Sequence, residues 1–261
     1  MKSCTTSALC SCLCVIFNNI QGYKMSDKIF SALRFATNAH SGQFRKSTKI
    51  PYIVHPIAVM EYLIRYQATE DAVIAGILHD TLEDTPTTQT DLRRNFGDRV
   101  TELVLGASEP NKSLFWEQRK EHTISHLNTL NDQEQLMVIC ADKLSNISSI
   151  AYDLSTQGPV VWNRFNRGYE QQKWYYCSLA SVFAKHSGKS KIFSDYIMAV
   201  NSVFAATPRP LVSKCHKNCL KKNSLPSVFL HYAKTRQTIN NSGSGNWTRT
   251  NDIRINRLNC E

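Results

Sequence analysis

Residues 70–84 of this 261-residue chain have the sequence EDAVIAGILHDTLED, which predicts a buried helix ending in ionisable side chains. Val73, Ile74, Ile77 and Leu78 recur at the spacing of one helical face, behind an acidic first turn. Residues three and four apart lie on the same side of an α-helix, so these four side chains should face a core. The stretch is therefore interpreted as a core helix with chemically reactive groups at its end.

Helical periodicity and helix-boundary signals continue from Met25 onward. They are an N-cap at Ser26-Asp27, a first-turn Pro56, a capping box at Thr88–Asp91 in a helix ended by Gly97, an all-round apolar helix through Leu136–Ala141, and two later helices around 162–185 and 192–204. No alternating strand pattern and no Asn-Gly hairpin signal occurs between these segments. The predicted fold class is all-α, a helical bundle.

The net charge of +10 lies entirely in the two ends of the chain. Residues 206–261 contain ten Lys or Arg and two acids, and residues 1–24 contain two Lys and no acid, which leaves residues 25–205 neutral. A basic composition favours nucleic-acid binding only when the basic face belongs to a folded domain. We divide the chain into an N-terminal extension outside the fold (1–24), one folded domain (25–206) and a basic tail predicted to be disordered (207–261).

Both ends of the chain are interpreted as segments outside the domain. The apolar run Leu9–Phe17 fits a weak secretory signal or an over-extended start, and we favour the second, with Met25 as the true first residue. The ending GNWTRTNDIRINRLNC resembles a mistranslated stable-RNA gene, which would make the tail a read-through product.

Cysteine usage and hydropathy indicate the compartment. Of nine cysteines only Cys140 and Cys177 lie in the central region, whereas a disulfide-built secreted fold would have them throughout it. No stretch approaches a membrane-spanning apolar length. We expect a soluble, cytoplasmic protein without membrane contact or specific nucleic-acid partner, and its oligomeric state is not indicated.

Four side chains have the chemistry of a metal site. His55, His79, Asp80 and Asp142 combine imidazole and carboxylate, which suit a borderline-to-hard divalent cation such as Mn²⁺, Fe²⁺ or Zn²⁺. Four such ligands leave coordination positions open for water and a phosphate oxygen. The alternative is that the adjacent His-Asp pair forms a satisfied core hydrogen bond. Burying so many ionisable groups without a cation is costly, so we favour the metal site.

Further polar residues follow three of these ligands by one helical turn. Glu83 and Asp84 come four residues after His79 and Asp80, and Asn146 comes four residues after Asp142. On a continuous helix this spacing places them on the same face as the proposed ligands. One helix would thus present two ligands and two more carboxylates, unless the acidic pair is an ordinary solvated turn.

Several segments resemble, in order and near-identical spacing, the hydrolase domain of the RelA/SpoT family and its stand-alone small alarmone hydrolases. They are ATNAHSGQFRKS (36–47), PYIVHPIAVM (51–60), AGILHDTLEDTPTT (75–88), FGDRVTELV (96–104) and ICADKLSNISSI (139–150). The set is highly specific. It implies an HD-domain helical bundle and metal-dependent hydrolysis of the 3′-diphosphate of (p)ppGpp to GDP or GTP and pyrophosphate.

The resemblance also implies residue roles. His55, His79, Asp80 and Asp142 would ligate one Mn²⁺, Glu83 and Asp84 would position and deprotonate the attacking water, Arg45 would pack on the base with Lys46 and Ser47 in its loop, and Asn146 and Ser149 would contact the substrate near the ribose and phosphates. The family often has histidine at Ser145 and threonine at Ser149. These departures make the nucleotide contacts less well defined than the metal ligands.

Two other functions remain open at this point. A phosphohydrolase with the same metal would act on another nucleotide, namely a 5′-nucleotide, a dNTP or NADPH. A protein of a different class would bind nucleic acid through its basic ends and use the helical core as a non-catalytic scaffold. The neutral central region argues against the second alternative.

Overall fold

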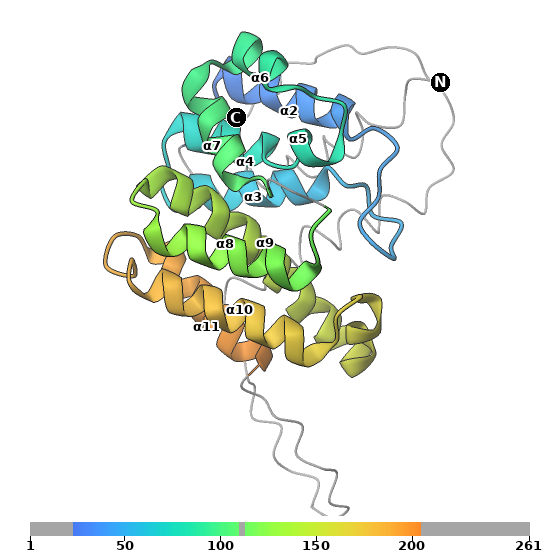
Figure 1. The fold of residues 1–261 in the computed structure, drawn as a ribbon. Coiled ribbons are helices and arrows are strands. Elements are labelled where there is room, and N and C mark those ends of the chain that lie inside the picture. Colours follow the sequence, from blue (N-terminus) through green and yellow to red (C-terminus); the bar gives the residue numbers. More distant parts are fainter. Residues whose placement is uncertain (1–22, 110–112, 205–261) are drawn as a thin grey trace, which may run out of the picture.

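The structure, a computed structural model, describes residues 23–109 and 113–204, and within them the all-α expectation is confirmed (Figure 1). These residues form helices and one isolated bridge between Phe44 and Pro51. Met25, the expected first residue, lies within the described residues. The apolar run at 9–17 and the basic tail lie outside them.

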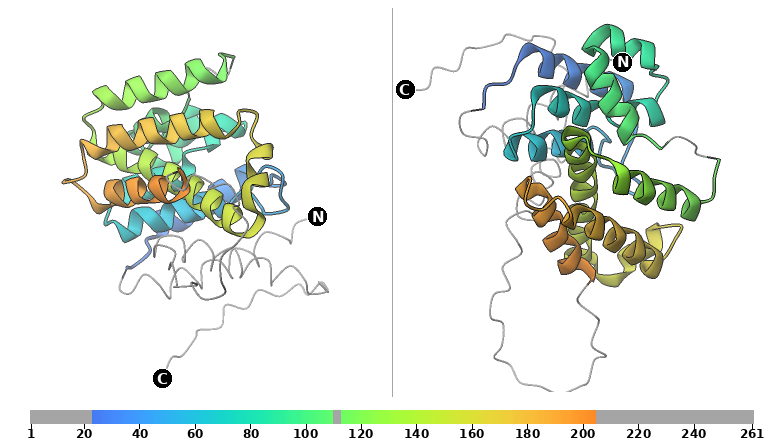
Figure 2. Two further views of the ribbon diagram at one scale, coloured as in Figure 1. Left: turned by 90° about the horizontal axis from the view of Figure 1, so that it is seen from below. Right: turned by 60° about the vertical axis from the view of Figure 1, so that its left-hand side comes forward.

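The helices follow one another along the chain, and residues 40–53 form the loop between the first two. They are α2 (Asp27–Ala39), α3 (Val54–Arg65), α4 (Glu70–Leu78), α5 (Thr81–Asp84), α6 (Gln89–Phe96), α7 (Asp98–Ala107), α8 (Trp116–Thr129), α9 (Gln133–Gln157), the 3₁₀ helix η1 (Gly158–Arg164), α10 (Tyr169–Ala184) and α11 (Lys191–Phe204). Helix α9 packs on α3, α4 and α7 on one side and on α11 on the other, so it runs through the middle of the bundle (Figures 1 and 2).

Local sequence signals determine where several helices begin. The Ser26 hydroxyl accepts a hydrogen bond from the N–H of Ile29 at the start of α2. Thr88 and Asp91 form the expected reciprocal capping box at the start of α6. Gly97 follows α6 with φ +89°, a conformation that favours glycine. Each of these predictions is confirmed, and the caps give hydrogen-bond partners to backbone N–H groups in the first turns of α2 and α6.

The core is built around α9. Leu136, Val138, Ala141, Leu144 and Ile147 are fully buried on several sides of this helix, as expected for a central element. Twenty-five residues of α-helix span about 37 Å, and over this length α9 contacts helices from both the first and the last parts of the described chain. Polar side chains on α9 are consequently held in fixed positions relative to α3 and α4.

The helix predicted around 162–185 begins later than expected. Trp162 lies in η1, and α10 starts only at Tyr169. Gly158, with φ +72°, ends α9, and Gly168 stands at the N-cap of α10. The residues between α9 and α10 therefore form a compact connection beside the long helix.

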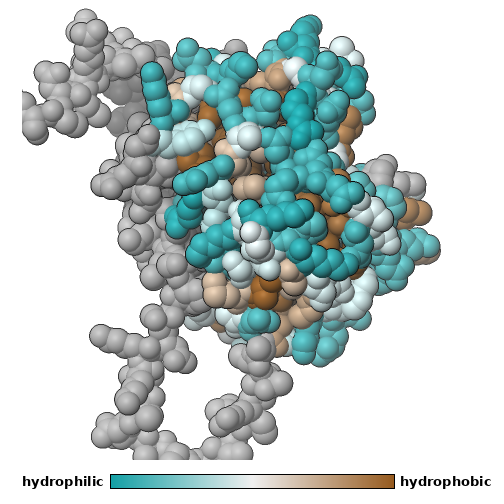
Figure 3. Space-filling view, turned by 90° about the vertical axis from the view of Figure 1, so that its left-hand side faces the viewer, coloured by the Kyte–Doolittle hydropathy of each residue, from teal (hydrophilic) through white to brown (hydrophobic). Residues whose placement is uncertain are grey.

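One face of the bundle is largely polar. The face in Figure 3 is mostly hydrophilic, with hydrophobic residues in small separate patches. Within residues 23–109 and 113–204, each helix is too short or too polar to cross a membrane.

We predict that a fragment from Met25 to Ala206 folds and melts in one cooperative transition, because the described core lies almost wholly within these limits. Tyr23 also packs partly buried against the core, so a fragment that starts at Tyr23 should melt at a higher temperature. Circular dichroism melts of both fragments test this.

The fragment from Met25 to Ala206 also tests nucleic-acid binding, because it has no net charge. Any weak, steeply salt-dependent binding of the full chain to DNA or RNA should vanish in it. A fragment without a cooperative transition would show that the domain boundary is misplaced.

Candidate metal centre

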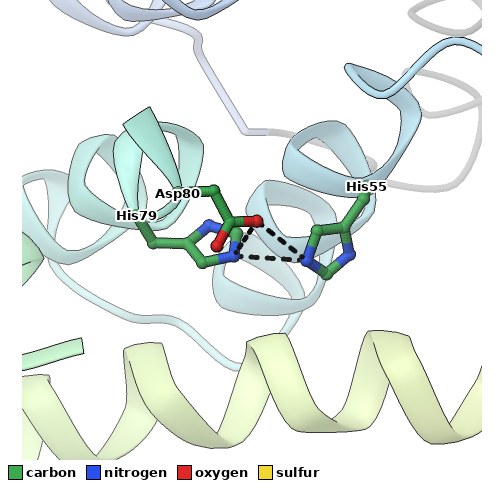
Figure 4. A group of neighbouring side chains, drawn as sticks. All are labelled: His55, His79 and Asp80. Atoms are coloured by element: carbon green, nitrogen blue, oxygen red, sulfur yellow. Dashed lines mark hydrogen bonds and ion pairs between the residues drawn. The ribbon is translucent and has the colours of Figure 1, made fainter. Parts of the chain in front are cut away.

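Two histidines and an aspartate from separate elements point at one another in the bundle interior (Figure 4). His55 comes from the first turn of α3, and His79 and Asp80 lie between α4 and α5. The two Nε2 atoms are 3.2 Å apart, and the Oδ2 of Asp80 lies 3.0 Å from His79 Nε2 and 3.6 Å from His55 Nε2. The residues are buried or half-buried.

Asp142 on α9 adds a second carboxylate to this group. Its Oδ1 lies 3.2 Å from the Nε2 of His55 and 3.7 Å from the Nε2 of His79. The structure thus brings together all four residues that the sequence singled out as ligands, from three parts of the chain. The spacing of these residues along the sequence does not predict that their side chains lie this close together.

The outward ring nitrogens of both histidines have partners. His79 Nδ1 donates to the carbonyl of Gly76 over 2.8 Å, so its Nε2 lone pair is directed at the cluster in the neutral tautomer. His55 Nδ1 lies 3.0 Å from the Oγ of Ser145, one of the positions where this chain departs from the family pattern. Such outer hydrogen bonds orient imidazoles that bind metal ions.

The charged groups of this cluster favour the binding of a cation. Burial, and after it the charge of Arg45, lowers the pKa of His55 to about 4. Burial acts in the same direction on His79, but the carboxylates of Asp80 and Asp142 outweigh it and raise the pKa of His79 to about 9. Two carboxylates and two converging imidazole nitrogens are costly to bury unless a positive charge lies between them. The donor set, mixed nitrogen and oxygen, fits a divalent cation.

The expectation of one continuous helix from His79 to Asp84 is wrong. Helix α4 ends at Leu78, and the short α5 begins at Thr81. The Thr81 hydroxyl donates to the carbonyl of Leu78 over 2.7 Å, and the carbonyl of Asp80 accepts from the N–H of Asp84 over 2.9 Å. A new turn therefore starts at Asp80, and the acidic pair is held by it instead of by α4.

The acidic pair lies beside the cluster with different surroundings. The carboxylate of Glu83 accepts a hydrogen bond from the N–H of Glu109 over 2.7 Å. Burial raises the pKa of Glu83, against the effect of that N–H, and the charge of Asp80 adds to the rise. The carbonyl of Asp84 accepts from the Nε2 of Gln43 over 2.7 Å, which ties α5 to the loop after α2.

Two residues missed by the sequence analysis touch the cluster. The Tyr52 hydroxyl donates to the Oδ2 of Asp80 over 2.6 Å, and burial, followed by the Asp80 charge, raises the pKa of Tyr52 so that it keeps its proton. Lys143 Nζ donates to the Oδ2 of Asp142 over 2.6 Å. Tyr52 lies three residues before His55, but only the fold shows that it faces Asp80.

A cavity of about 280 Å³ is lined by residues of the loop after α2, of α9 and of the segment after it. Its lining includes Arg45, Lys46, Asn146 and Ser149, which the sequence analysis assigned to substrate binding. The Arg45 guanidinium donates to the Oδ1 of Asn146 over 2.8 Å. Ser47, the fifth assigned residue, is not among the lining residues of this cavity. The volume is near the lower end of ordinary small-molecule sites.

Asn146 links this cavity to the metal cluster. Its Nδ2 donates to the Oδ1 of Asp142 over 2.6 Å, and its Oδ1 accepts from Arg45. Tyr52 also contacts both the cluster and the cavity. Its ring lines the cavity under Arg45, with 5.6 Å between the Cζ of Arg45 and the centroid of the Tyr52 ring. A molecule in the cavity would therefore adjoin the cluster.

Curated proteins with similar sequences include enzymes that are named for the synthesis or hydrolysis of (p)ppGpp. The guanosine-3′,5′-bis(diphosphate) 3′-pyrophosphohydrolase of Borreliella burgdorferi is 33% identical over 132 residues, which are 48% of this chain and 19% of that protein. The bifunctional (p)ppGpp synthase/hydrolase SpoT of Escherichia coli is 33% identical over 138 residues, 50% of this chain and 20% of that protein. The chain thus spans about a fifth of the length of these relatives.

Two solved structures match nearly over their own full length. A crystal structure of lmo0812 from Listeria monocytogenes is 41% identical with a TM-score of 0.54, and covers 58% of this chain and 99% of its own. A metazoan ortholog of SpoT that hydrolyzes ppGpp is 25% identical with a TM-score of 0.56, over 70% and 97%. The names of the curated relatives and of the metazoan ortholog confirm the resemblance to RelA/SpoT-type hydrolases. The HD domain model matches residues 32–166, more than half of the sequence, and the chain therefore belongs to the HD domain family.

Proposed function

We propose that this protein is a divalent-cation-dependent phosphohydrolase that removes the 3′-diphosphate of (p)ppGpp, giving pyrophosphate and GDP or GTP. The observation that carries the proposal is a buried His-Asp cluster that adjoins both an acidic pair and a cavity lined with positively charged side chains. The names of the relatives in Borreliella burgdorferi and Escherichia coli and the ppGpp hydrolysis by the metazoan ortholog support the choice of substrate. We place the reaction in the cytoplasm.

We assign Mn²⁺ to the cluster formed by His55, His79, Asp80 and Asp142. Imidazole nitrogens and carboxylate oxygens in equal number suit Mn²⁺ better than Mg²⁺, which prefers oxygen ligands and retains its waters. When bound, such a cation lowers the pKa of water and draws charge from a phosphoryl oxygen. The Tyr52 hydroxyl, which stays protonated, would orient the carboxylate of Asp80 through their 2.6 Å hydrogen bond.

Glu83 is the proposed proton acceptor for the attacking water. Its raised pKa suits a group that takes up a proton during the reaction and later returns it. The N–H of Glu109 holds one side of its carboxylate. We assign Asp84 the neighbouring role of positioning the water, since Gln43 ties the Asp84 backbone in place.

The cavity is the proposed nucleotide site. A guanidinium stacks on a base and still donates to phosphate, which fits Arg45 at the cavity wall. Asn146 contacts both Arg45 and Asp142 and would place the ribose next to the reacting phosphorus. Lys46 and Ser149 complete the assigned contacts. Ser47 would act only by shaping the loop, where its φ of +58° is unusual for a residue other than glycine.

Removal of the cation should abolish the activity. We expect no turnover after dialysis against EDTA, and restoration by Mn²⁺ above that by Mg²⁺, because the ligand set includes two imidazoles. His79→Ala should lose Mn²⁺ binding in calorimetry, whereas His122→Ala, exposed on α8, should bind and turn over normally. Full turnover in excess chelator would contradict the proposal.

Glu83→Gln should keep the cation and lose turnover by roughly 10²–10⁴-fold, the usual range for removal of a general base. The amide oxygen can still accept from the N–H of Glu109, so the fold should be unchanged. Glu102→Gln, largely exposed on α7, is the matched control and should retain full activity. If Glu83→Gln and Asp84→Asn both run near the wild-type rate, the assignment of water activation is wrong.

The substrate should carry a 3′-diphosphate, and the released product should be pyrophosphate. Purified protein with Mn²⁺ is incubated with ppGpp, GTP, dGMP and NADPH, and the products are separated by ion-exchange chromatography. We expect ppGpp to be hydrolysed fastest. Faster hydrolysis of any of the other three would identify an HD phosphohydrolase of a different nucleotide.

A further inference from the structure

An ion pair at the cavity wall has no part in the functions assigned so far. Asp153 on α9 is 1% exposed and pairs with Arg164 at the end of η1. Both residues line the cavity, and the Arg164 guanidinium lies over the ring of Phe165, with 5.0 Å between Cζ and the ring centroid. A buried carboxylate and an aromatic face thus fix the position of Arg164, whose side chain is 19% exposed.

A second cation reaches the same wall from a distant part of the chain. Lys46, in the loop before α3, donates through Nζ to the Oδ1 of Asn166 over 3.2 Å. Asn166 is two residues beyond Arg164. Among the described residues that line the cavity, the charged side chains are those of Arg45, Lys46 and Arg164, which are positive, and Asp153, which is negative. These residues give the cavity lining an excess of positive charge.

This wall is remote from the metal cluster. Asp142 and Asp153 are eleven residues apart on α9, which is about 16 Å along a helix axis. Asn146 and Ser149 lie between them and line the cavity. A ligand whose reacting phosphate adjoins the cluster would reach Arg164 only with its opposite end.

We propose that Arg164 and Lys46 form a second anion subsite, which takes the 5′-phosphates of a nucleotide that is phosphorylated at both its 3′ and 5′ positions. The inference rests on the proposed function, because that function places the 3′-diphosphate at the metal cluster. Asp153 occupies only part of the Arg164 guanidinium, whose fork of donors matches phosphate oxygens. The subsite would make the enzyme specific for nucleotides with an anionic group at each end.

Asp153 acts in this subsite as a positioning residue. Without it, a long arginine side chain would lose rotamer freedom when it bound an anion, and the affinity would fall. Because the buried carboxylate of Asp153 already orders the Arg164 side chain in the folded protein, this entropy is lost on folding and not on binding. The same pair also joins η1 to α9, so its removal has a structural cost that the test must separate from ligand binding.

The test compares the binding of GDP and guanosine to the full chain with Mn²⁺ present, by calorimetry. Charge-assisted hydrogen bonds to phosphate should make the wild type bind GDP roughly ten to a hundred times more tightly than guanosine. Arg164→Gln should reduce that ratio about tenfold. Arg167→Gln is the matched control, since Arg167 pairs with Glu117 on the surface and does not line the cavity, and it should leave the ratio unchanged.

A second variant protects the test against unfolding. Arg164→Gln leaves Asp153 buried without its cation, so the double variant Arg164→Gln/Asp153→Asn is measured as well, and both should reduce the ratio. Equal affinity of the wild type for GDP and guanosine would overturn the subsite. So would an equal loss of affinity for both ligands in the Arg164 variants, which would place Arg164 against the base.

The outcome is separable from that of the proposed function. A preference for GDP that depends on Arg164, together with no hydrolysis of ppGpp, would retain the subsite and reject the 3′-diphosphate reaction. Hydrolysis of ppGpp with no effect of Arg164 on the ratio of GDP to guanosine affinity would retain the reaction and reject the subsite.

Discussion

The convergence of two imidazoles and two carboxylates inside an apolar bundle is the constraint on which the rest of this structure depends. Groups of this kind are expensive to bury, and each one here has outer hydrogen bonds that aim it at its neighbours. Ser145, Gly76, Tyr52 and Lys143 supply these contacts. The fold therefore orients the cluster before any ligand arrives.

Helix α9 joins this cluster to the cavity. Several of its sides are apolar and pack on α3, α4, α7 and α11, which places the helix in the middle of the core. Asp142, Asn146, Ser149 and Asp153 lie along its remaining polar side. Because a helix has a fixed rise per residue, α9 sets the spacing between Asp142 in the cluster and Asp153, which positions Arg164 of the proposed anion subsite.

The break after α4 gives the acidic pair its own support. A continuous helix would have fixed Glu83 and Asp84 on the same face as His79 and Asp80. The turn that begins at Asp80 instead allows Glu83 to accept from Glu109 and Asp84 to be tied to Gln43. Residues far apart in the chain thus share in placing two neighbouring carboxylates.

The sequence by itself determined the helical class and the caps at Ser26 and Thr88, and it singled out the four candidate ligands, because these follow from local periodicity and side-chain chemistry. It did not determine the break at His79-Asp80, where the hydroxyl of Thr81 competes with the helical pattern. Nor did it indicate that Arg164 faces the cavity containing Arg45. Contacts between residues distant in sequence depend on how helices pack, and only the tertiary structure decided them.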